Sequence, residues 1–588
     1  MSFALLLLAA ASRQETIGVQ NCTDNFRKDA KAFSRSMTQL CAAVQQIDPA
    51  DSQSIEHAKG KLKSARLAYK RIAFFLDYFF FTSSRIYNRP PKNEIEEPHL
   101  EYAAPTGLQY IEALLFENPE KHQEEIVRQC RFLHTAAEDL PALLYNFKAT
   151  DAQILESVRI ELVRVMTLSI TGFDAPLLKS GLQEAFVSLQ TIDAVLKPYM
   201  THSDSDTVRK LLASCEASLY KSDSFDNFDR LSFLTRHALP LQESLGQMIR
   251  EMGLEVNQKG ILNYNAKNIF SPDAFAKSAF DGIENPQAAL NKLGEKLFFE
   301  TRLSSDGSRS CASCHNPALY FTDGLPKSIG VHPGQLTRRN APTLLYSTFQ
   351  HAQFWDGRAG TLEEQIRLVI RDSVEMNGQP AEVIRKLVKE RQYRRLLRRA
   401  FPRRKVLDDT IIYKAIASYV RTLQPFSSDF DKYMAGDKTA LTERQVNGFN
   451  LFMGKGQCGT CHFVPLFNGL VPPAYALTEF EILGTTAGGD LLKPRADPDQ
   501  GRFEPRPTPY YRGAFKTPTV RNAAVSAPYM HNGAFANLET VMEFYDKGGG
   551  SGLGLDIPYQ TLPAAPLNLS DEEKNDIIGF LQSLTDRL

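Results

Sequence analysis

Apolar residues recur at helical spacing through the first 250 residues of the chain. The apolar positions of residues 155–166 follow one face of a helix, which Gly172 and Pro176 are expected to end. Comparable apolar stripes predict helices at residues 26–47, 56–81, 124–146 and 182–199. Alternating patterns of the kind that strands show are scarce. This part of the sequence therefore predicts an all-α bundle.

The composition changes after about residue 260, where Gly, Pro and Asn increase and long loops separate the helical stretches. Two predicted helices in this part each precede a cysteine motif. Asn285-Pro286 caps the first, which runs to Phe299, and a capping box at Thr442-x-x-Gln445 begins the second. This internal repeat predicts two domains of similar design. A last helix, from Ser570-x-x-Glu573 onward, is expected to pack against the first helix of the second domain.

Both repeats contain the pattern C-x-x-C-H, at Cys311–His315 and Cys458–His462. This pattern is the attachment signal for c-type haem, in which two thiols bond to the porphyrin and the histidine supplies an axial iron ligand. A zinc site would need the two cysteine pairs close together, and they are 147 positions apart (458 − 311). A disulfide or a thioredoxin-like redox site would need neither histidine. We therefore expect two covalent haem c groups, held by Cys311, Cys314, His315, Cys458, Cys461 and His462.

The predicted organisation of the 588-residue chain is all-α, with a helical bundle followed by two cytochrome c-type haem domains. The expected segments are a partial signal segment at 1–20, the bundle at 21–250, a linker at 251–270, haem domain 1 at 271–435 and haem domain 2 at 436–588.

Charge and hydropathy exclude some classes of function. Lys+Arg and Asp+Glu are both 68, so net charge gives no sign of nucleic-acid binding. No apolar run reaches the roughly 18 residues of a membrane span. Because haem is joined to C-x-x-C-H outside the cytoplasm, we expect a periplasmic protein. Residues 4–11 are apolar but lack the basic flank of a complete signal peptide.

The cysteines outside the haem motifs all lie in the first 250 residues. They could form two disulfides, although lone buried thiols are the commoner arrangement. These cysteines are Cys22, Cys41, Cys130 and Cys215.

Residues 270–588 resemble the bacterial dihaem cytochrome c peroxidase and MauG superfamily. Besides the haem motifs, the resemblance rests on Gly330-Val331-His332, Arg339–Thr343, Phe354–Arg358, Glu375-Met376 and Thr517–Gly533. It implies an oxidoreductase that reduces hydrogen peroxide at the first haem. The electrons would come from a small periplasmic donor, a cytochrome c or a cupredoxin. Alternatively, as in MauG, a high-valent haem would oxidise a protein substrate.

The resemblance also implies roles for residues near the first haem. Peroxide cleavage needs a group that moves a proton from the inner to the outer oxygen, and Glu375 matches the distal glutamate that does so. Gln365 matches a distal-pocket position, and Val369 stands where relatives carry a proline. His332 matches the residue that ligates the first haem at rest in the peroxidase branch, a ligation that MauG-like members lack.

Around the second haem, the resemblance implies a relay residue and an unusual ligand. Trp355, the single tryptophan, matches a tryptophan that relatives place between the haems. Tyr545, fourteen residues beyond His531 (545 − 531), stands where the peroxidase branch has methionine and the MauG branch tyrosine. A phenolate stabilises ferric and higher states, whereas a thioether stabilises ferrous iron. Met542, three positions out of register, is the alternative ligand.

A calcium ion between the haem domains is a further implication of the resemblance. The matching positions are Asn340, Ser526 and Pro528, which offer the hard oxygen donors that Ca²⁺ prefers. The family often dimerises, so the chain is expected to be a monomer or a homodimer.

Residues 105–116 resemble the signature segment of imelysin-like proteins, helical periplasmic bundles linked to iron uptake. Of the motif G-x-H-x-x-E, Gly107 and Glu112 are present, and Gln109 replaces the histidine. Glu112 could bind a metal with other carboxylates, or simply cap or bridge helices. We expect a docking or regulatory module rather than a second enzyme. The candidate partner carboxylates are Glu96, Glu97 and Glu101.

Two other classes of function stay open at this stage. In one, the chain is a non-enzymatic electron carrier with two six-coordinate irons, and Glu375 then has no purpose. In the other, it is an iron-binding protein led by the helical bundle, with haem as an accessory.

Overall fold

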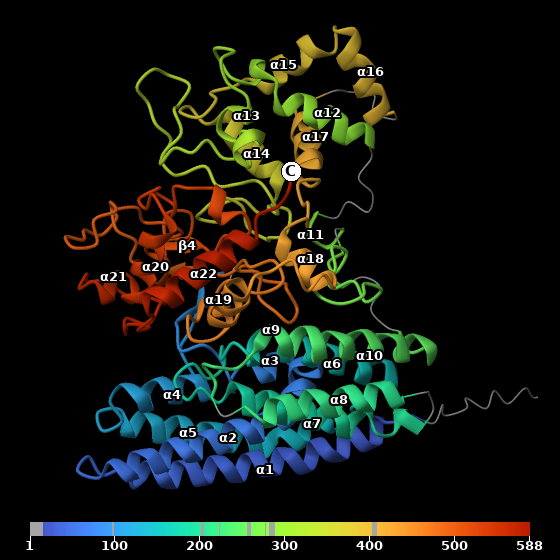
Figure 1. Cartoon of the computed structure of the whole chain (residues 1–588), viewed down its shortest axis with the longest axis vertical. Helices are drawn as coiled ribbons and strands as arrows, with labels where there is room; N and C mark the ends of the chain where they lie inside the picture. The colour runs from blue at the N-terminus through green and yellow to red at the C-terminus, as the bar shows by residue number, and fades with distance from the viewer. Residues whose placement is uncertain are drawn as a thin grey trace, which may run out of the picture.

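The computed structural model describes residues 16–96, 99–201, 205–222, 224–255, 260–276, 278–281, 288–402 and 408–588. Figure 1 shows three parts stacked along the longest axis of the molecule. The N-terminal helices form one end, the helices of residues 288–420 form the other, and the C-terminal helices lie between them. The order of the parts in space therefore differs from their order in the sequence.

Helices that pack side by side form the N-terminal bundle (Figure 1). The predicted helices are confirmed, except that residues 140–144 form a separate 3₁₀ turn. A π-helical turn, Val165–Ser169, extends α6 toward the predicted stop at Gly172. The helices are α1 (Val19–Gln45), α2 (Ser52–Phe79), α3 (Phe81–Ser84), α4 (Leu108–Glu117), α5 (Gln123–Asp139), α6 (Asp151–Arg164), α7 (Gly181–Leu196), α8 (Asp206–Tyr220), α9 (Arg230–Phe233) and α10 (Leu239–Glu251).

The two other parts consist of shorter helices joined by long loops. The helices of the distal part are α12 (Ala288–Phe298), α13 (Cys311–Cys314), α14 (Leu362–Arg371), α15 (Pro380–Leu387), α16 (Arg391–Ala400) and α17 (Thr410–Val420). Those of the middle part are α18 (Asp429–Ala435), α19 (Glu443–Met453), α20 (Leu538–Asp546), α21 (Gly549–Gly552) and α22 (Asp571–Ser583). A single helical turn, α11 (Ser278–Asp281), lies on the connection from the bundle.

Two small antiparallel strand pairs were not predicted. β1 (Glu94–Glu96) pairs with β2 (Glu101–Ala103), and β3 (Phe480–Ile482) pairs with β4 (Ala514–Lys516). Each strand has three residues, which is too short for an alternating pattern to be recognised. The β3–β4 pair matters because it joins two distant loops beside the cavity described below.

The internal repeat is visible as the same helix crossing in both regions that carry a C-x-x-C-H motif. α12 packs on α17, and α19 packs on α22. A Cβ atom at Gly294 would lie 1.8 Å from the carbonyl oxygen of Ala415, and one at Gly448 would lie 1.9 Å from that of Asp576. Only glycine permits so close an approach of two backbones. The predicted packing of the last helix is therefore confirmed.

The predicted helix starts in this region are confirmed where they are described. Both capping boxes, at Thr442 with Gln445 and at Ser570 with Glu573, are formed. The predicted cap at Asn285-Pro286 lies outside the described residues, as do residues 1–15 of the expected signal segment.

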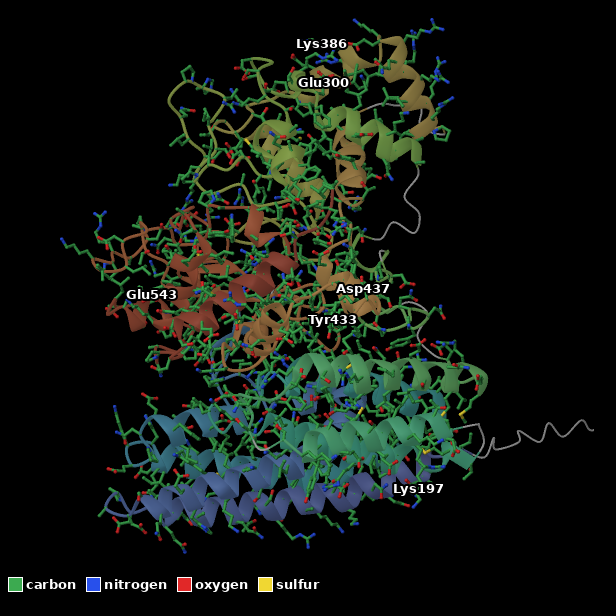
Figure 2. The ribbon with its side chains drawn as sticks, viewed as in Figure 1. Lys197, Glu300, Lys386, Tyr433, Asp437 and Glu543 are labelled. Atoms are coloured by element: carbon green, nitrogen blue, oxygen red, sulfur yellow. The ribbon has the colours of Figure 1, made fainter. Side chains whose placement is uncertain are left out.

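The middle part meets the bundle directly. The side-chain oxygen of Asn450 in α19 accepts a hydrogen bond from the amide N–H of Leu231, at 2.9 Å. Figure 2 labels Tyr433 and Asp437 of the middle part, which lie near this boundary, and Lys197, which lies within the bundle.

None of the described helices combines the length and apolar character that a membrane crossing requires. The four cysteines of the bundle form no disulfide, and three of them are buried, so the commoner arrangement of lone thiols is the one observed.

Replacement of either crossing glycine tests this packing. Gly294→Ala and Gly448→Ala are expected to lower the free energy of unfolding by about 1–3 kcal/mol, because the new methyl group forces the paired helices apart. Thermal unfolding followed by circular dichroism measures the loss.

Gly60→Ala in α2 is the matched control. Apart from the backbone of its own helix, no atom lies within 4 Å of the new methyl position, and alanine is favoured over glycine in a helix by roughly 1 kcal/mol. Unfolding of Gly448→Ala at the wild-type temperature would contradict the close crossing.

Candidate active site

One cavity of about 1120 Å³ connects the two cysteine motifs. Pockets for a single small ligand have volumes of about 300–1,000 Å³, so the cavity has room for large groups. The lining includes every cysteine and histidine of both motifs: Cys311, Cys314, His315, Cys458, Cys461 and His462.

A backbone carbonyl orients each motif histidine. Nδ1 of His315 lies 3.1 Å from the carbonyl oxygen of Phe321, and Nδ1 of His462 lies 3.0 Å from that of Pro518. A carbonyl oxygen only accepts hydrogen bonds, so Nδ1 carries the proton and Nε2 is left as a metal donor. Burial lowers the pKa of His462 to about 4, which keeps this ring neutral, as metal binding requires.

The wall beside the first motif carries the predicted acid–base group. Glu375 follows α14 and is half-buried, and its amide N–H donates to the carboxylate of Asp372. Burial raises the pKa of Glu375 to about 7, reinforced by the charge of Asp372 and opposed by Arg358. Gln365 and Val369 of α14 line the same cavity.

Among the residues predicted for the two haem sites, His332 is the one that lies outside the cavity lining. It is exposed, in a loop that the backbone bond from Gly330 to Gln335 closes, and it is not part of the cavity lining.

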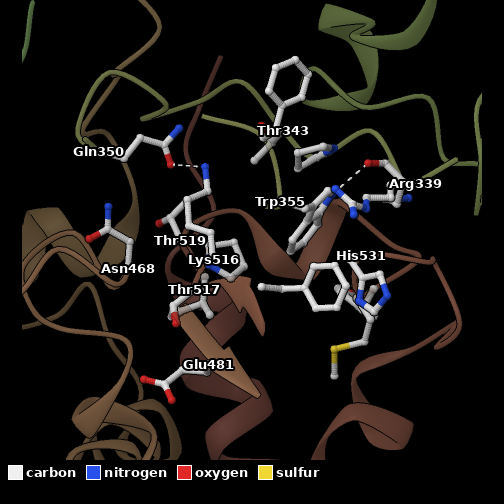
Figure 3. A pocket seen from close by; sticks show the side chains of 18 of the residues that line it. Arg339, Thr343, Gln350, Trp355, Asn468, Glu481, Lys516, Thr517, Thr519 and His531 are labelled. Atoms are coloured by element: carbon white, nitrogen blue, oxygen red, sulfur yellow. Dashed lines mark hydrogen bonds between the residues drawn. The ribbon is translucent and has the colours of Figure 1, made fainter. Parts of the chain in front are cut away.

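Trp355 links the two halves of the cavity wall (Figure 3). Its indole N–H donates to the carbonyl oxygen of Asn340, at 3.0 Å. Its own carbonyl accepts a bond from the amide of Lys516 in β4, at 2.7 Å. The tryptophan is therefore fixed to a loop of the distal part and to a strand of the middle part.

Lys516 is a site residue that the sequence analysis missed. Its buried ammonium donates to the side-chain oxygen of Gln350, at 2.6 Å, and to the carbonyl of Ala352 (Figure 3). Burial lowers the pKa of Lys516 to about 7, against the opposing charge of Asp356. No local pattern marks this lysine, because only the long-range β3–β4 pairing brings it to the cavity.

α20 brings both candidate ligands of the second haem to the cavity. Tyr545 is half-buried and Met542 is buried, and both line the wall. The Tyr545 hydroxyl makes no hydrogen bond within the described part of the chain. Burial and the nearby Cys461, Cys458 and Glu481 raise the pKa of Tyr545.

The three positions matched to calcium ligands also line the cavity. Asn340 is buried and its side-chain amide donates to the carbonyl of Leu325, at 2.9 Å, while its backbone N–H donates to that of His531. Ser526 and Pro528 follow in the chain segment that leads to His531.

In the bundle, the Glu112 carboxylate already has protein partners. It accepts from the backbone N–H groups of Leu177 and Leu178, at 2.7 and 2.9 Å, and lies 3.8 Å from the Arg66 guanidinium. Glu101 is exposed, whereas Glu112 is buried. The Glu96 side chain and Glu97 lie outside the described residues.

Gln109, in the histidine position of that motif, is buried and donates to the carboxylate of Asp174, at 3.3 Å. Lys70 and Asn88 bind the same carboxylate. Lysine, arginine and backbone donors thus occupy the place where a cation would bind. Across the described ranges, no group of three or more His, Cys, Asp and Glu side chains forms a metal site.

Comparison with known proteins identifies the family. The model of the di-haem cytochrome c peroxidase family matches residues 288–439. Cytochrome-c peroxidase IdrP1 of Pseudomonas sp. (strain SCT) is 38% identical over 323 residues, which cover 51% of this chain and 82% of the relative. The chain belongs to the dihaem cytochrome c peroxidase and MauG family. It is accordingly an oxidoreductase that carries haem c, and the cavity and its paired histidines fit that group.

Two further relatives of this dihaem oxidoreductase cover the same extent of chain. Methylamine utilization protein MauG of Methylorubrum extorquens is 36% identical, covering 50% of this chain and 77% of its own. A solved MauG-like protein associated with microbial copper homeostasis is 32% identical, with a TM-score of 0.46, covering 51% of this chain and 90% of its own.

Loss of one cysteine pair tests the attachment sites. The double substitution Cys311→Ser, Cys314→Ser is expected to remove one of two covalent haems, and Cys458→Ser, Cys461→Ser the other, because the thiols form the bonds to the porphyrin. Intact-protein mass and haem content per chain measure the change. Cys41→Ser is the control and keeps both haems; retention of both haems by either pair variant would exclude that motif as an attachment site.

Proposed function

We propose that this oxidoreductase reduces hydrogen peroxide at the site of His315 and takes up electrons at the site of His462. The observation that carries the proposal is that Glu375, Trp355 and both haem motifs line one cavity. The balanced reaction is H₂O₂ + 2H⁺ + 2e⁻ → 2H₂O.

A haem held by Cys311, Cys314 and His315 would supply the iron and the electrons for peroxide reduction, and the protein supplies the proton transfer. The Glu375 carboxylate accepts a proton from the oxygen nearer the iron and donates it to the outer oxygen, which leaves as water. A pKa near 7 suits both halves of this task, because the group then gains and loses a proton with similar ease. Gln365 and Val369 shape the pocket beside it.

Trp355 is proposed to carry electrons between the two sites. Its indole is held at the nitrogen and its main chain at the carbonyl, so its position relative to both halves of the cavity is fixed. This anchoring supports a relay role, since electron transfer across the cavity depends on a fixed separation.

Calcium is proposed to bind through the side chain of Asn340 and the backbone carbonyls of Ser526 and Pro528. Donation by the Asn340 amide nitrogen to Leu325 orients the side chain and leaves its oxygen as a hard donor. The ion would join the distal and middle parts.

A second candidate function is oxidation of a protein substrate, as the MauG resemblance implies. Two observations favour it: Tyr545 lies on the cavity wall, and His332 is exposed away from the cavity. In the first function the electrons come from a small cytochrome c or cupredoxin, and in the second from side chains of the substrate. Both place the protein in the periplasm, where haem c is attached.

Substitution of the distal carboxylate tests the peroxide reaction. Glu375→Gln is expected to lower the second-order rate constant with peroxide by about 10²–10⁴-fold, since an amide cannot accept the proton. The wild-type rate should rise with pH through about 7, because burial raises the Glu375 pKa to about 7 and only the ionised form is a base. Stopped-flow measurements across pH test both expectations.

Glu382→Gln, at an exposed carboxylate of α15, is the control and should keep both the rate and its pH dependence. The same pH dependence in Glu375→Gln would assign the proton transfer to another group. Absence of any peroxide reaction in the wild type would favour the electron-carrier function.

Paired substitutions in α20 identify the ligand of the second haem. Tyr545→Phe is expected to change the absorption and electron paramagnetic resonance spectra of that haem, because it removes the anionic oxygen donor. Met542→Leu, one turn earlier, should leave them unchanged. The opposite result would make Met542 the ligand and favour a peroxidase with a high-potential second haem.

A further inference from the structure

The N-terminal bundle supplies part of the wall of the cavity. The contributing side chains come from the segment after α3, from α4 and from the loop after the π-helical turn of α6. They are Pro90, Pro91, Lys92, Gln109, Phe173 and Pro176. Residues more than 280 positions away from the second haem motif (458 − 176 = 282) therefore help to enclose it.

The bundle also contacts the attachment motif itself. A Cβ atom at Gly459, between the two cysteines, would lie 3.2 Å from the methyl group of Thr171. The Phe173 ring packs edge-on against that of Phe463, with centroids 5.7 Å apart, directly after the motif histidine. Four residues before the motif (458 − 454), the Arg230 guanidinium lies against Gly454.

Within this interface, a lysine of the bundle meets two carboxylates of the second haem region. Nζ of Lys92 lies 2.8 Å from Oε2 of Glu479 and 3.5 Å from Oε1 of Glu481. The three side chains are 26%, 24% and 11% exposed, respectively. Partial burial makes such charges interact more strongly than surface ions do.

The same carboxylate segment leads to the ligand of the second haem. The carbonyl of Glu479 accepts a bond from the amide of Thr517, at 3.1 Å. The next residue, Pro518, supplies the carbonyl that orients His462. Glu479 is thus connected to His462 through one backbone hydrogen bond to Thr517 and the adjacent residue Pro518.

We propose that the N-terminal bundle is a built-in wall of the second haem site, and that Lys92 is its positioning residue, balancing Glu479 and Glu481 and thereby setting that haem's reduction potential. The inference rests on the haem proposed above as the point of electron uptake. Neither the peroxidase resemblance nor the family match covers Lys92.

The direction of the effect follows from charge. Negative side chains near the iron favour the oxidised haem, because the oxidised form carries one more positive charge, and an ammonium group does the opposite. Removal of Lys92 leaves two carboxylates uncompensated on the wall shared with Cys461 and Tyr545. The second haem should then become harder to reduce, while the first is unchanged.

The test is a spectroelectrochemical titration of the full-length holoprotein. Lys92→Gln is expected to lower the equilibrium constant for reduction of the second haem about tenfold, which corresponds to about 59 mV for one electron. Lys92→Arg keeps the charge and should keep the potential. Lys210→Gln, at an exposed lysine of α8, is the matched control and should change nothing.

Glu479→Gln is expected to shift the reduction potential in the opposite direction to Lys92→Gln. It serves as the test if the Lys92→Gln protein does not fold. It should raise the potential of the second haem, which a merely structural role for this contact does not predict. Wild-type potentials in both Lys92→Gln and Glu479→Gln would overturn the proposal. The titration uses no peroxide, so shifted potentials without peroxide turnover would reject only the peroxidase function, and unshifted potentials with normal turnover would reject only this inference.

Discussion

The hydrogen bond from each motif histidine to a backbone carbonyl is the contact on which the site depends. It fixes the tautomer, so that Nε2 of His315 and of His462 is unprotonated and can bind a metal. It also ties the direction of each ligand to a loop outside the motif. The geometry of the haem sites is therefore set by the packing of those loops, and not by the five motif residues alone.

The two carbonyls are held in different ways. Phe321 belongs to a tight local turn in which the amide of Asn316 bonds to Thr322, so the first histidine is oriented by residues close to it in sequence. Pro518 follows β4, whose register depends on β3 and on the segment around Glu479. The second histidine is thus sensitive to distant structure, including the N-terminal bundle, whereas the first is largely insulated from it.

Most of the fold could be predicted because its signals are local. Helical stripes marked the bundle, and the boxes at Thr442 and Ser570 marked helix starts. The motifs and Glu375 could be recognised for the same reason. Lys516 and Lys92 could not, because each acquires its role through a partner more than 150 residues away (516 − 350 = 166; 479 − 92 = 387). His332 is the opposite case. Its local motif matched the family, but the fold leaves its side chain exposed and outside the cavity lining.

The place of the bundle in the stack bears on how the enzyme would be controlled. It lies against the middle part, next to the second haem motif, and the distal part with Glu375 is at the opposite end of the molecule (Figure 1). A change in the bundle therefore acts first on the site of His462, which is proposed above to take up electrons. The bundle also covers one side of the Cys458–His462 segment, so an electron donor of the proposed kind would approach from another side. Since arginine, lysine and backbone donors hold the buried Glu112, Asp174 and Glu184 of the bundle, its core is a fixed scaffold from which Lys92 reaches the second site. Control by the bundle would accordingly be expressed in the rate of electron uptake, with the proton transfer at Glu375 left unchanged.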